Sequence, residues 1–417
     1  MADPVDERIE TLVIGGGQAG LAMSHCLAGS GVDHVVLERG RVAERWRSER
    51  WDSLRLLTPN WQTRLPGFRY QGHDPDGYMR VGEVVDFLQG YARSFAAPVE
   101  EGTSVLRVGG AEGGFRVETD RGTWRAASVV IATGHCDTPL VPSFAASLPG
   151  RVAQLVPSRY RHPDQLPPGG VLVVGASSSG VQLADEIHAS GRPVTLAVGR
   201  HTRLPRVYRG RDILWWLDAM GVLDESISDV FDPAASRSQP SLQLVGRPDR
   251  ATLDLPALRA RGVRLVGRAT GAEGGRVFVA DDLVAYTAAA DARLARLVQR
   301  IDIFAARTGL DAEVAAPEPF RPFLWPDPGP TEIDLRAEGI RSVVWATGFR
   351  RLYPWLKLPV LDERGEIRHE GGVTAFPGLY VIGLYFQRRR KSSFIDGVGS
   401  DAMELSAHLA GHLRLAA

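Results

Sequence analysis

The sequence predicts an α/β fold, because one unit of apolar strand, glycine-rich turn and helix occurs twice in its 417 residues. The first copy spans residues 9–28 and the second spans residues 171–189, about 160 positions later. A further strand signal follows each helix, at 34–38 and at 194–198. Both copies therefore have the β–α–β pattern of a doubly wound parallel sheet, and we expect two Rossmann-like domains.

The first glycine turn has the spacing of a dinucleotide-binding fingerprint. Gly15 permits a tight turn, Gly17 lets backbone N–H groups approach a pyrophosphate, and Gly20 lets the helix pack closely on the strand. The turn follows a strand and opens a helix, which is the context that this motif requires.

The residues around this turn complete a predicted nucleotide site. Gln18 and Ala19 open the helix, whose N-terminus carries a partial positive charge that favours phosphate. Glu38, which ends the next strand, can hydrogen-bond a ribose diol, and Arg39 follows it. We assign this site to FAD.

The second turn is a variant of the first. Ser177 stands where the middle glycine is usual, and its small side chain can donate a hydrogen bond to phosphate. The predicted contacts of this second site are Gly175, Ser177, Ser178, Ser179 and Gly180.

The end of the second strand indicates which nucleotide this site takes. Arg200 occupies the position where an acid would favour a free ribose 2′-hydroxyl, and an arginine favours a 2′-phosphate. We therefore expect NADPH rather than NADH, with Arg203 and Arg206 as weaker candidates for the same phosphate. The alternative is that Arg200 is one more surface residue in an arginine-rich chain.

Breaker residues suggest how the domains are divided. A proline and glycine cluster at 163–170 precedes the second copy, and the proline-rich stretch 317–330 follows its helical extension. We expect an FAD-binding domain made of residues 1–165 and 319–417, with a C-terminal helix. The NADPH-binding domain, with a helical insertion, would be inserted between them as residues 166–318.

Composition excludes several classes of partner. Lys+Arg and Asp+Glu both number 49, so the net charge of +0 gives no sign of nucleic-acid or membrane binding. No apolar run reaches the roughly 18 residues of a membrane span, and the first strand leaves no room for a signal peptide. Cys26 and Cys136 form no Cys-x-x-Cys pair, which favours a reducing compartment. We expect a cytoplasmic protein without a metal site, and its oligomeric state stays open.

The order of these pieces resembles the class B flavin monooxygenases, which include plant auxin-forming, heteroatom-oxidising and Baeyer–Villiger enzymes. The resemblance covers nearly the whole chain. Besides Glu38, it rests on the two glycine turns and on the segments Glu44–Arg47, Trp51–Pro59 and Val343–Phe349.

The resemblance also implies roles for single residues. Trp46 would lie near FAD, the backbone at Val105 would meet the adenine, and Thr347 and Gly348 would lie near the nicotinamide. Thr133 and Gly134 end the matching strand of the first domain, where a glycine lets the chain turn beside a cofactor.

Three positions depart from the family pattern. Leu148 and Gln154 stand where the family fingerprint has phenylalanine and histidine, and Leu57 stands where heteroatom-oxidising members have asparagine. These departures concern oxygen insertion more than cofactor binding.

Few residues have the character of acid–base catalysts, and no catalytic residue is assigned. His135 could approach the flavin or be an ordinary loop histidine, and the basic run 387–393 could face solvent or a cofactor phosphate. In this family the flavin carries the chemistry.

The resemblance implies an FAD- and NADPH-dependent monooxygenase. It would insert one atom of O2 into a small organic substrate through an oxygen adduct at flavin C4a, as N/S oxidation or Baeyer–Villiger insertion. The alternatives are an NADPH:acceptor oxidoreductase without oxygen insertion and a flavin-bound protein without turnover.

Overall fold

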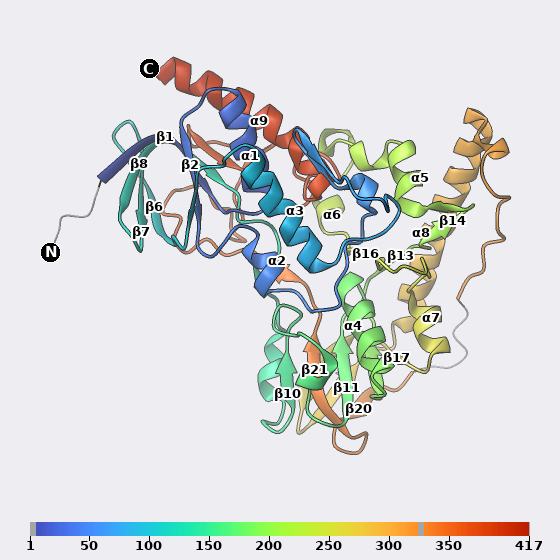
Figure 1. Cartoon of the computed structure of the whole chain (residues 1–417). Helices are drawn as coiled ribbons and strands as arrows, with labels where there is room; N and C mark the ends of the chain where they lie inside the picture. Colours follow the sequence, from blue (N-terminus) through green and yellow to red (C-terminus); the bar gives the residue numbers. More distant parts are fainter. Residues whose placement is uncertain (1–5, 324–328, 417) are drawn as a thin grey trace.

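The computed structural model describes residues 6–323 and 329–416, which build two parallel sheets (Figure 1). Residues 324–328 of the expected proline-rich linker lie outside the described residues. The parallel core of the first sheet has the order β25–β8–β1–β2–β5. Its strands are β1 (Asp6–Ile14), β2 (His34–Glu38), β5 (Val99–Glu101), β8 (Thr123–Ile131) and β25 (Leu379–Val381).

Antiparallel strands extend this sheet on the side of β8 and β25. β6 (Val105–Ala111) and β7 (Gly114–Thr119) form a meander with β8, whereas β23 (His369–Glu370) and β24 (Val373–Thr374) continue from β25. The parallel core strands read as nearly continuous apolar runs, because helices and loops cover both faces of the sheet.

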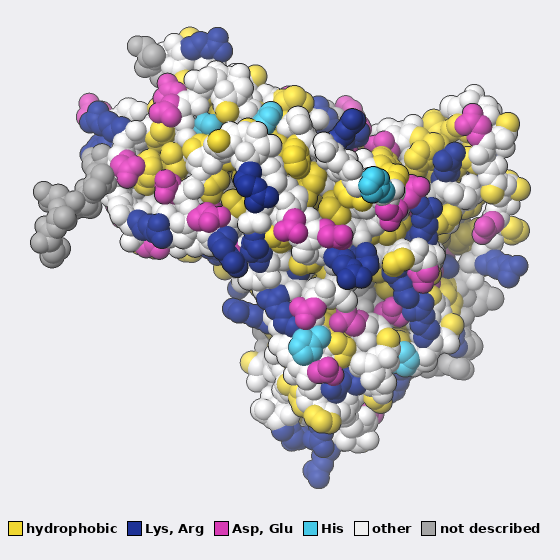
Figure 2. Space-filling view, viewed as in Figure 1, with side chains coloured by type: hydrophobic (Ala, Val, Ile, Leu, Met, Phe, Trp, Pro, Cys, Tyr) yellow, Lys and Arg dark blue, Asp and Glu magenta, His cyan; other side chains and the backbone are white. Residues whose placement is uncertain are grey.

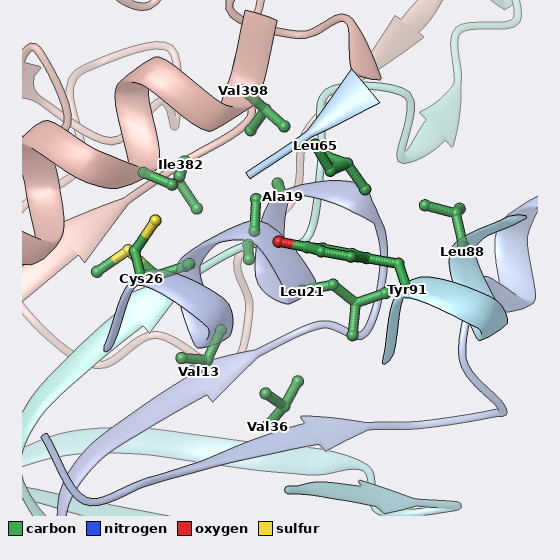
Figure 3. Packing of buried hydrophobic residues seen from close by; sticks show 14 of the residues in the cluster. Val13, Ala19, Leu21, Cys26, Val36, Leu65, Leu88, Tyr91, Ile382 and Val398 are labelled. Atoms are coloured by element: carbon green, nitrogen blue, oxygen red, sulfur yellow. The ribbon is translucent and has the colours of Figure 1, made fainter. Parts of the chain in front are cut away.

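One face of the first sheet carries α1 (Gln18–Gly29), α3 (Val81–Ser94) and α9 (Ile395–Ala416). Ala19 of α1, Leu65 and Val398 of α9 converge in this core (Figure 3). Leu65 comes from a short hairpin, β3 (Arg64–Leu65) and β4 (Phe68–Arg69), which packs against α9. Both α1 and this hairpin are thereby held against the C-terminal helix α9.

The second sheet is parallel, with the order β10–β21–β11–β12–β17. One of its faces packs on α4 (Ser178–Ala189) and α7 (Leu255–Ala260), and the other on the antiparallel sheet β18–β19–β20. The strands are β10 (Ala153–Leu155), β11 (Gly170–Val174), β12 (Val194–Ala197), β17 (Arg264–Val266), β18 (Ala269–Glu273), β19 (Arg276–Val279), β20 (Glu332–Asp334) and β21 (Ile340–Trp345). The two-domain α/β fold expected from the repeated β–α–β unit is confirmed.

The chain passes between the two sheets along a short ladder. β9 (Thr138–Pro139) pairs antiparallel with β22 (Phe349–Arg350), and the Leu140 N–H donates to the Gly348 carbonyl at 2.9 Å. Both strands lie just after the Ala-Thr-Gly segments. The strands β10 and β21 belong to the second sheet, although they lie outside residues 166–318. We therefore propose that the domains exchange at this ladder.

A helical insertion follows β12 and forms a core of its own. The apolar spacing of Leu294, Val298 and Ile301 in the sequence predicts a helix over 292–304. The longest helix of the insertion, α8 (Leu283–Thr308), begins nine residues before that stretch. The alanine-rich start of α8 has weak apolar periodicity, so the sequence pattern does not predict the first turns of this helix. The other elements of the insertion are α5 (Ile213–Ala219), α6 (Pro233–Arg237), β13 (Thr202–Arg203), β14 (Val207–Tyr208), β15 (Arg211–Asp212) and β16 (Leu242–Gln243). The first domain also contains the short helix α2 (Glu44–Ser48).

Short 3₁₀ turns complete the chain, at 60–62, 143–147, 163–165, 222–224, 227–229 and 310–312. In residues 6–323 and 329–416, no helix has the length and apolarity needed to cross a membrane. Basic and acidic side chains lie interspersed on the face shown in Figure 2.

The packing of α1 on its turn predicts a sharp difference between two glycines of one helix. A Cβ at Gly20 would lie 1.8 Å from the Gly15 carbonyl oxygen, whereas one at Gly29 meets nothing within 4 Å. We expect Gly20→Ala to destabilise the protein by about 1–3 kcal/mol, and Gly29→Ala to change its stability by less than about 1 kcal/mol. Urea unfolding measures both, and an equal effect of the two substitutions would contradict this packing.

Candidate cofactor sites

The first glycine turn is fixed against the end of β8. Gly15 has a φ of +115°, and a Cβ there would lie 2.7 Å from the Ala132 carbonyl oxygen. Gly17 caps α1, no side chain of the described residues bonds to that cap, and a Cβ on Gly17 would meet nothing within 4 Å. The turn thus leaves an open space at a helix N-terminus, which is the place where a phosphate binds.

Glu38 is held beside this turn with its carboxylate in a fixed orientation. Its two oxygens accept the N–H groups of Gly16 at 2.7 Å and of Gly40 at 2.8 Å, and the residue is 8% exposed. Each carboxylate oxygen keeps a second lone pair for another donor. Arg39 is exposed, and its guanidinium lies 3.4 Å from Glu49.

Three further residues of the predicted first site are Gln18, Ala19 and Val105. The Gln18 amide joins α1 to α2 and to the segment before α9, because its oxygen accepts from Trp46 Nε1 at 3.3 Å and its nitrogen donates to the Ser393 carbonyl at 3.4 Å. Ala19 is buried in the core below. Val105 begins β6, two residues after Thr103, whose N–H donates to the Glu38 carbonyl at 2.8 Å.

The second turn repeats the geometry of the first. Gly175 has a φ of +105°, and a Cβ at Gly180 would again lie 1.8 Å from the carbonyl oxygen of the turn's first glycine. Ser177 caps α4 with φ −81° and ψ −170°, and Gly17 caps α1 with φ −87° and ψ −173°. Since these angles are open to any residue, the serine leaves the turn unchanged.

The serines of this turn differ in their partners. Ser178 is buried, and its hydroxyl accepts a hydrogen bond from Gln182 Nε2 at 3.1 Å. Ser177 and Ser179 are half-buried, and the Ser177 side chain makes no capping bond to α4. The Ser177 hydroxyl is therefore not committed to its own helix.

The two Ala-Thr-Gly segments take equivalent places beside the two turns. Gly134 and Gly348 have φ values of +77° and +95°, so both segments leave their strands through backbone that favours glycine. The Thr347 hydroxyl donates to the Leu140 carbonyl, which places it in the crossing ladder. Thr133 is half-buried beside the first turn.

The predicted arginines of the second site separate into two groups. Arg200 is exposed in the loop after β12. Arg203 is paired with Asp254 at 2.8 Å and Asp291 at 2.6 Å, and Arg206 is 1% exposed and bonded to Asp212. Because carboxylates occupy both, Arg203 and Arg206 are not available to a phosphate, unlike Arg200.

The basic run 387–393 is neutralised by the acids around it. Arg389 pairs with Glu404 of α9 at 2.6 Å, and Lys391 pairs with Asp224 of the insertion at 3.0 Å and with Asp396 at 3.4 Å. The run is therefore neither a solvated basic stretch nor a free phosphate-binding loop. It ties α9 to the helical insertion.

Gln154, which replaces the family histidine, has a structural role. Its amide nitrogen donates to the Ala145 carbonyl at 3.1 Å, and its oxygen accepts from Trp345 Nε1 at 2.9 Å. Leu148 is packed in the same core. Both departures from the family pattern therefore lie in the wall of the second sheet.

Sequence reasoning missed a cluster of charged groups around Cys136, at the start of the first crossing. Arg45 donates to the Cys136 carbonyl and pairs with Asp137, and the Arg50 guanidinium lies 5.1 Å from the Trp46 ring centroid. Burial alone would raise the pKa of the thiol, but His135, Arg50 and Arg45 lower it below its ordinary value. Cys26, in the core of the first domain, has its pKa raised by burial to about 11. Nothing local in the sequence shows that α2 and this crossing meet.

Comparisons with known proteins agree with this architecture. Residues 12–213 match the pyridine nucleotide-disulphide oxidoreductase family. The chain is 33% identical over 408 residues to an uncharacterized oxidoreductase CzcO-like of Geobacillus kaustophilus, covering 97% of this chain and 99% of that protein. It is 31% identical over 208 residues to the indole-3-pyruvate monooxygenase YUCCA1 of rice, covering 47% of this chain and 50% of that protein.

The fold is that of a solved flavoprotein. A flavin-containing monooxygenase from Stenotrophomonas maltophilia superposes with a TM-score of 0.67 at 20% identity, covering 97% of this chain and 99% of that one. Fold and family together define a flavin-dependent oxidoreductase with two dinucleotide-binding domains. The chain belongs to the class B flavin monooxygenase family, and CzcO-like oxidoreductases are its full-length relatives.

The different surroundings of the two cysteines predict selective alkylation. A thiolate reacts and a thiol does not, so a lowered pKa makes Cys136 reactive at a pH where Cys26 is still protonated. At pH 7.5 we expect iodoacetamide to modify Cys136 alone. The alkylation rate of Cys136 should rise with pH, and the midpoint of this rise should lie below the pKa of an ordinary thiol. Mass spectrometry of the labelled peptides measures this. Equal labelling of both cysteines in the folded protein would show that the cluster does not stabilise the thiolate.

Proposed function

We propose that this protein is an FAD- and NADPH-dependent monooxygenase that inserts one oxygen atom from O2 into a small organic substrate. The observation that carries the proposal is the pair of equivalent glycine turns, each at the carboxyl end of a parallel strand and each beside an Ala-Thr-Gly segment. Ligands of open α/β sheets bind at this position. The crossing ladder joins the chain just after the two Ala-Thr-Gly segments that lie beside these turns.

The residues of the first turn fit FAD. Gly15, Gly17 and Gly20 leave an open, uncapped helix N-terminus for the pyrophosphate, with Gln18 and Ala19 in its first turn. Glu38 would accept the ribose hydroxyls with its remaining lone pairs. A further set would line the rest of the cofactor, namely Arg39, Trp46, Val105, Thr133 and Gly134.

The residues of the second turn fit NADPH. Ser177 has the backbone geometry of Gly17, and its hydroxyl is not committed to capping α4. Arg200 is the exposed cation at the end of β12, where the ribose 2′-phosphate would lie. Gly175, Ser178, Ser179 and Gly180 would surround the pyrophosphate, and Thr347 and Gly348 would lie toward the nicotinamide.

The protein would bind, orient and enclose both cofactors, and the bound flavin would supply the chemistry of hydride acceptance and O2 activation. Trp46 is fixed by its hydrogen bond to Gln18 and by Arg50 above its ring, so it can serve as a rigid apolar wall. Such a wall keeps water from the reacting atoms. The described residues gather no metal-binding group of His, Cys, Asp and Glu side chains, and the proposal needs none.

The sequence relatives support oxygen insertion, since the rice relative is an indole-3-pyruvate monooxygenase. The full-length relative is called an oxidoreductase, a class that includes both monooxygenation and NADPH:acceptor reduction, the second candidate function. N/S oxidation and Baeyer–Villiger insertion both remain within the proposal. We also propose a cytoplasmic location, based on the two unpaired cysteines.

An aspartate substitution should weaken the binding of a different cofactor at each of the two turns. An aspartate at either N-cap fits the backbone but places a negative charge where a pyrophosphate would bind. We expect Gly17→Asp to weaken FAD binding on the order of 100-fold and to give a colourless protein. Ser177→Asp, the matched control, should stay yellow and lose affinity for NADP⁺. Flavin absorbance per chain and NADP⁺ titration measure the two effects. A folded Gly17→Asp protein with full flavin content would contradict the assignment of the first turn.

Reoxidation of the reduced flavoprotein separates the two candidate functions. After anaerobic reduction with NADPH, the protein is mixed rapidly with O2 and its absorbance is followed. A monooxygenase should regain the oxidised-flavin spectrum only after a delay, because the enclosed site retains the activated oxygen. Immediate recovery in one phase, with one H2O2 released per flavin, would instead identify the NADPH:acceptor oxidoreductase.

A further inference from the structure

Three arginines from two distant segments meet beside the end of β12. Arg200 lies in the loop that follows this strand, whereas Arg293 and Arg296 lie one helical turn apart on α8. The Arg293 guanidinium donates to the carbonyl of His201, the residue after Arg200, at 2.8 Å. α8 also packs against β13, which begins at the next residue. The contact is therefore part of the packing of the insertion against the second domain.

These arginines differ in charge balance from their neighbours. Within the described residues, Arg200, Arg293 and Arg296 have no carboxylate within ion-pair distance. Arg203 and Arg268, which stand in the same region, are both paired with aspartates. The pKa of Arg293 is lowered, first by burial and then by the positive charges of Arg200 and Arg296. The three guanidinium groups thus repel one another, and an anion placed among them would relieve that repulsion.

The position of the cluster identifies the anion. In a β–α–β nucleotide unit, the end of the second strand faces the 2′ position of the adenosine ribose. For the unit that begins with the turn at Gly175, this strand is β12 and Arg200 stands just beyond its end. A phosphate monoester carries a charge near −2 at neutral pH and accepts hydrogen bonds from several guanidinium groups at once. The 2′-phosphate of NADPH has this chemistry at this place.

We propose that Arg293 and Arg296 of α8 complete, with Arg200, the site that recognises the 2′-phosphate of NADPH. The inference rests on the proposed function, in which the second turn binds this nucleotide. It adds two specificity-determining residues from the helical insertion, more than 90 positions after Arg200 in the sequence. The insertion would then have a direct part in cofactor choice.

The test uses the FAD-loaded protein and two pairs of probes, NADP⁺ against NAD⁺ and 2′,5′-ADP against 5′-ADP. The variants are Arg200→Gln, Arg293→Gln and Arg296→Gln. Arg300→Gln is the matched control, because Arg300 is an exposed arginine on the same helix, two turns beyond Arg293 and one turn beyond Arg296. We expect each of the first three to weaken NADP⁺ and 2′,5′-ADP about tenfold, as the loss of one charge-assisted hydrogen bond predicts. NAD⁺, 5′-ADP and the Arg300 variant should change less than twofold.

The outcomes separate this inference from the function beneath it. If Arg200→Gln lowers the preference for NADP⁺ while Arg293→Gln and Arg296→Gln leave it unchanged, the proposal for α8 is overturned and NADPH use stands. If the unaltered protein does not prefer 2′,5′-ADP over 5′-ADP, the assignment of NADPH itself fails. The flavin spectrum and melting temperature of each variant show that folding and FAD binding are intact.

Discussion

The architecture depends on one close contact, which occurs in both domains. In it, a glycine in the first turn of a helix lies directly against the carbonyl oxygen of the first glycine of the turn before that helix. At both Gly20 and Gly180 a Cβ would lie 1.8 Å from that oxygen, so no side chain fits there. This contact brings the N-terminus of the helix to the end of the strand. The same turns lie against Ala132 and Ala346 of the Ala-Thr-Gly segments, and the phosphate binding that we propose depends on this arrangement. Helix and strand are thus packed by the same contact in both domains.

The helical insertion is fixed to the first domain by buried polar contacts. Arg206 bonds to Asp212 and donates to the Leu57 carbonyl at 2.7 Å, and the Tyr78 hydroxyl donates to Asp212 at 2.7 Å. An ion pair that is this buried stabilises little by itself, but removal of one partner is costly. Its effect is to hold the loop that contains Leu57 against the insertion. A second tie, from the basic run to Asp224 and Glu225, holds α9 to the same insertion.

Sequence alone predicted what depends on local pattern. The two β–α–β units, both turns and the acid at Glu38 are set by residues close together in the chain, and their structure is confirmed. The roles of these residues toward cofactors stay predictions. The sequence also predicted that Ser177 would be compatible with the second turn, because a small residue fits the extended backbone at this position. In contrast, β10 and β21 are short strands whose membership of the second sheet depends on pairing across nearly 190 residues.

The same limit applies to the sites. The pairing of Arg203 with Asp254 and Asp291, the pairing of Lys391 with Asp224 and the approach of Arg45 and Arg50 to Cys136 all involve groups far apart in sequence. Arg293 could not be connected with Arg200 until α8 was placed on β13. Residue type showed which side chains can bind an anion, but only the fold shows which of them still have no partner.

The ladder of β9 and β22 has a mechanical consequence. The two connections between the sheets run side by side and are hydrogen-bonded to each other, so they behave as one strap rather than as two independent tethers. Such a strap resists sliding and separation of the domains, and together with the ties of the insertion through Arg206 and Lys391 it would keep the distance between the two proposed nucleotide sites constant.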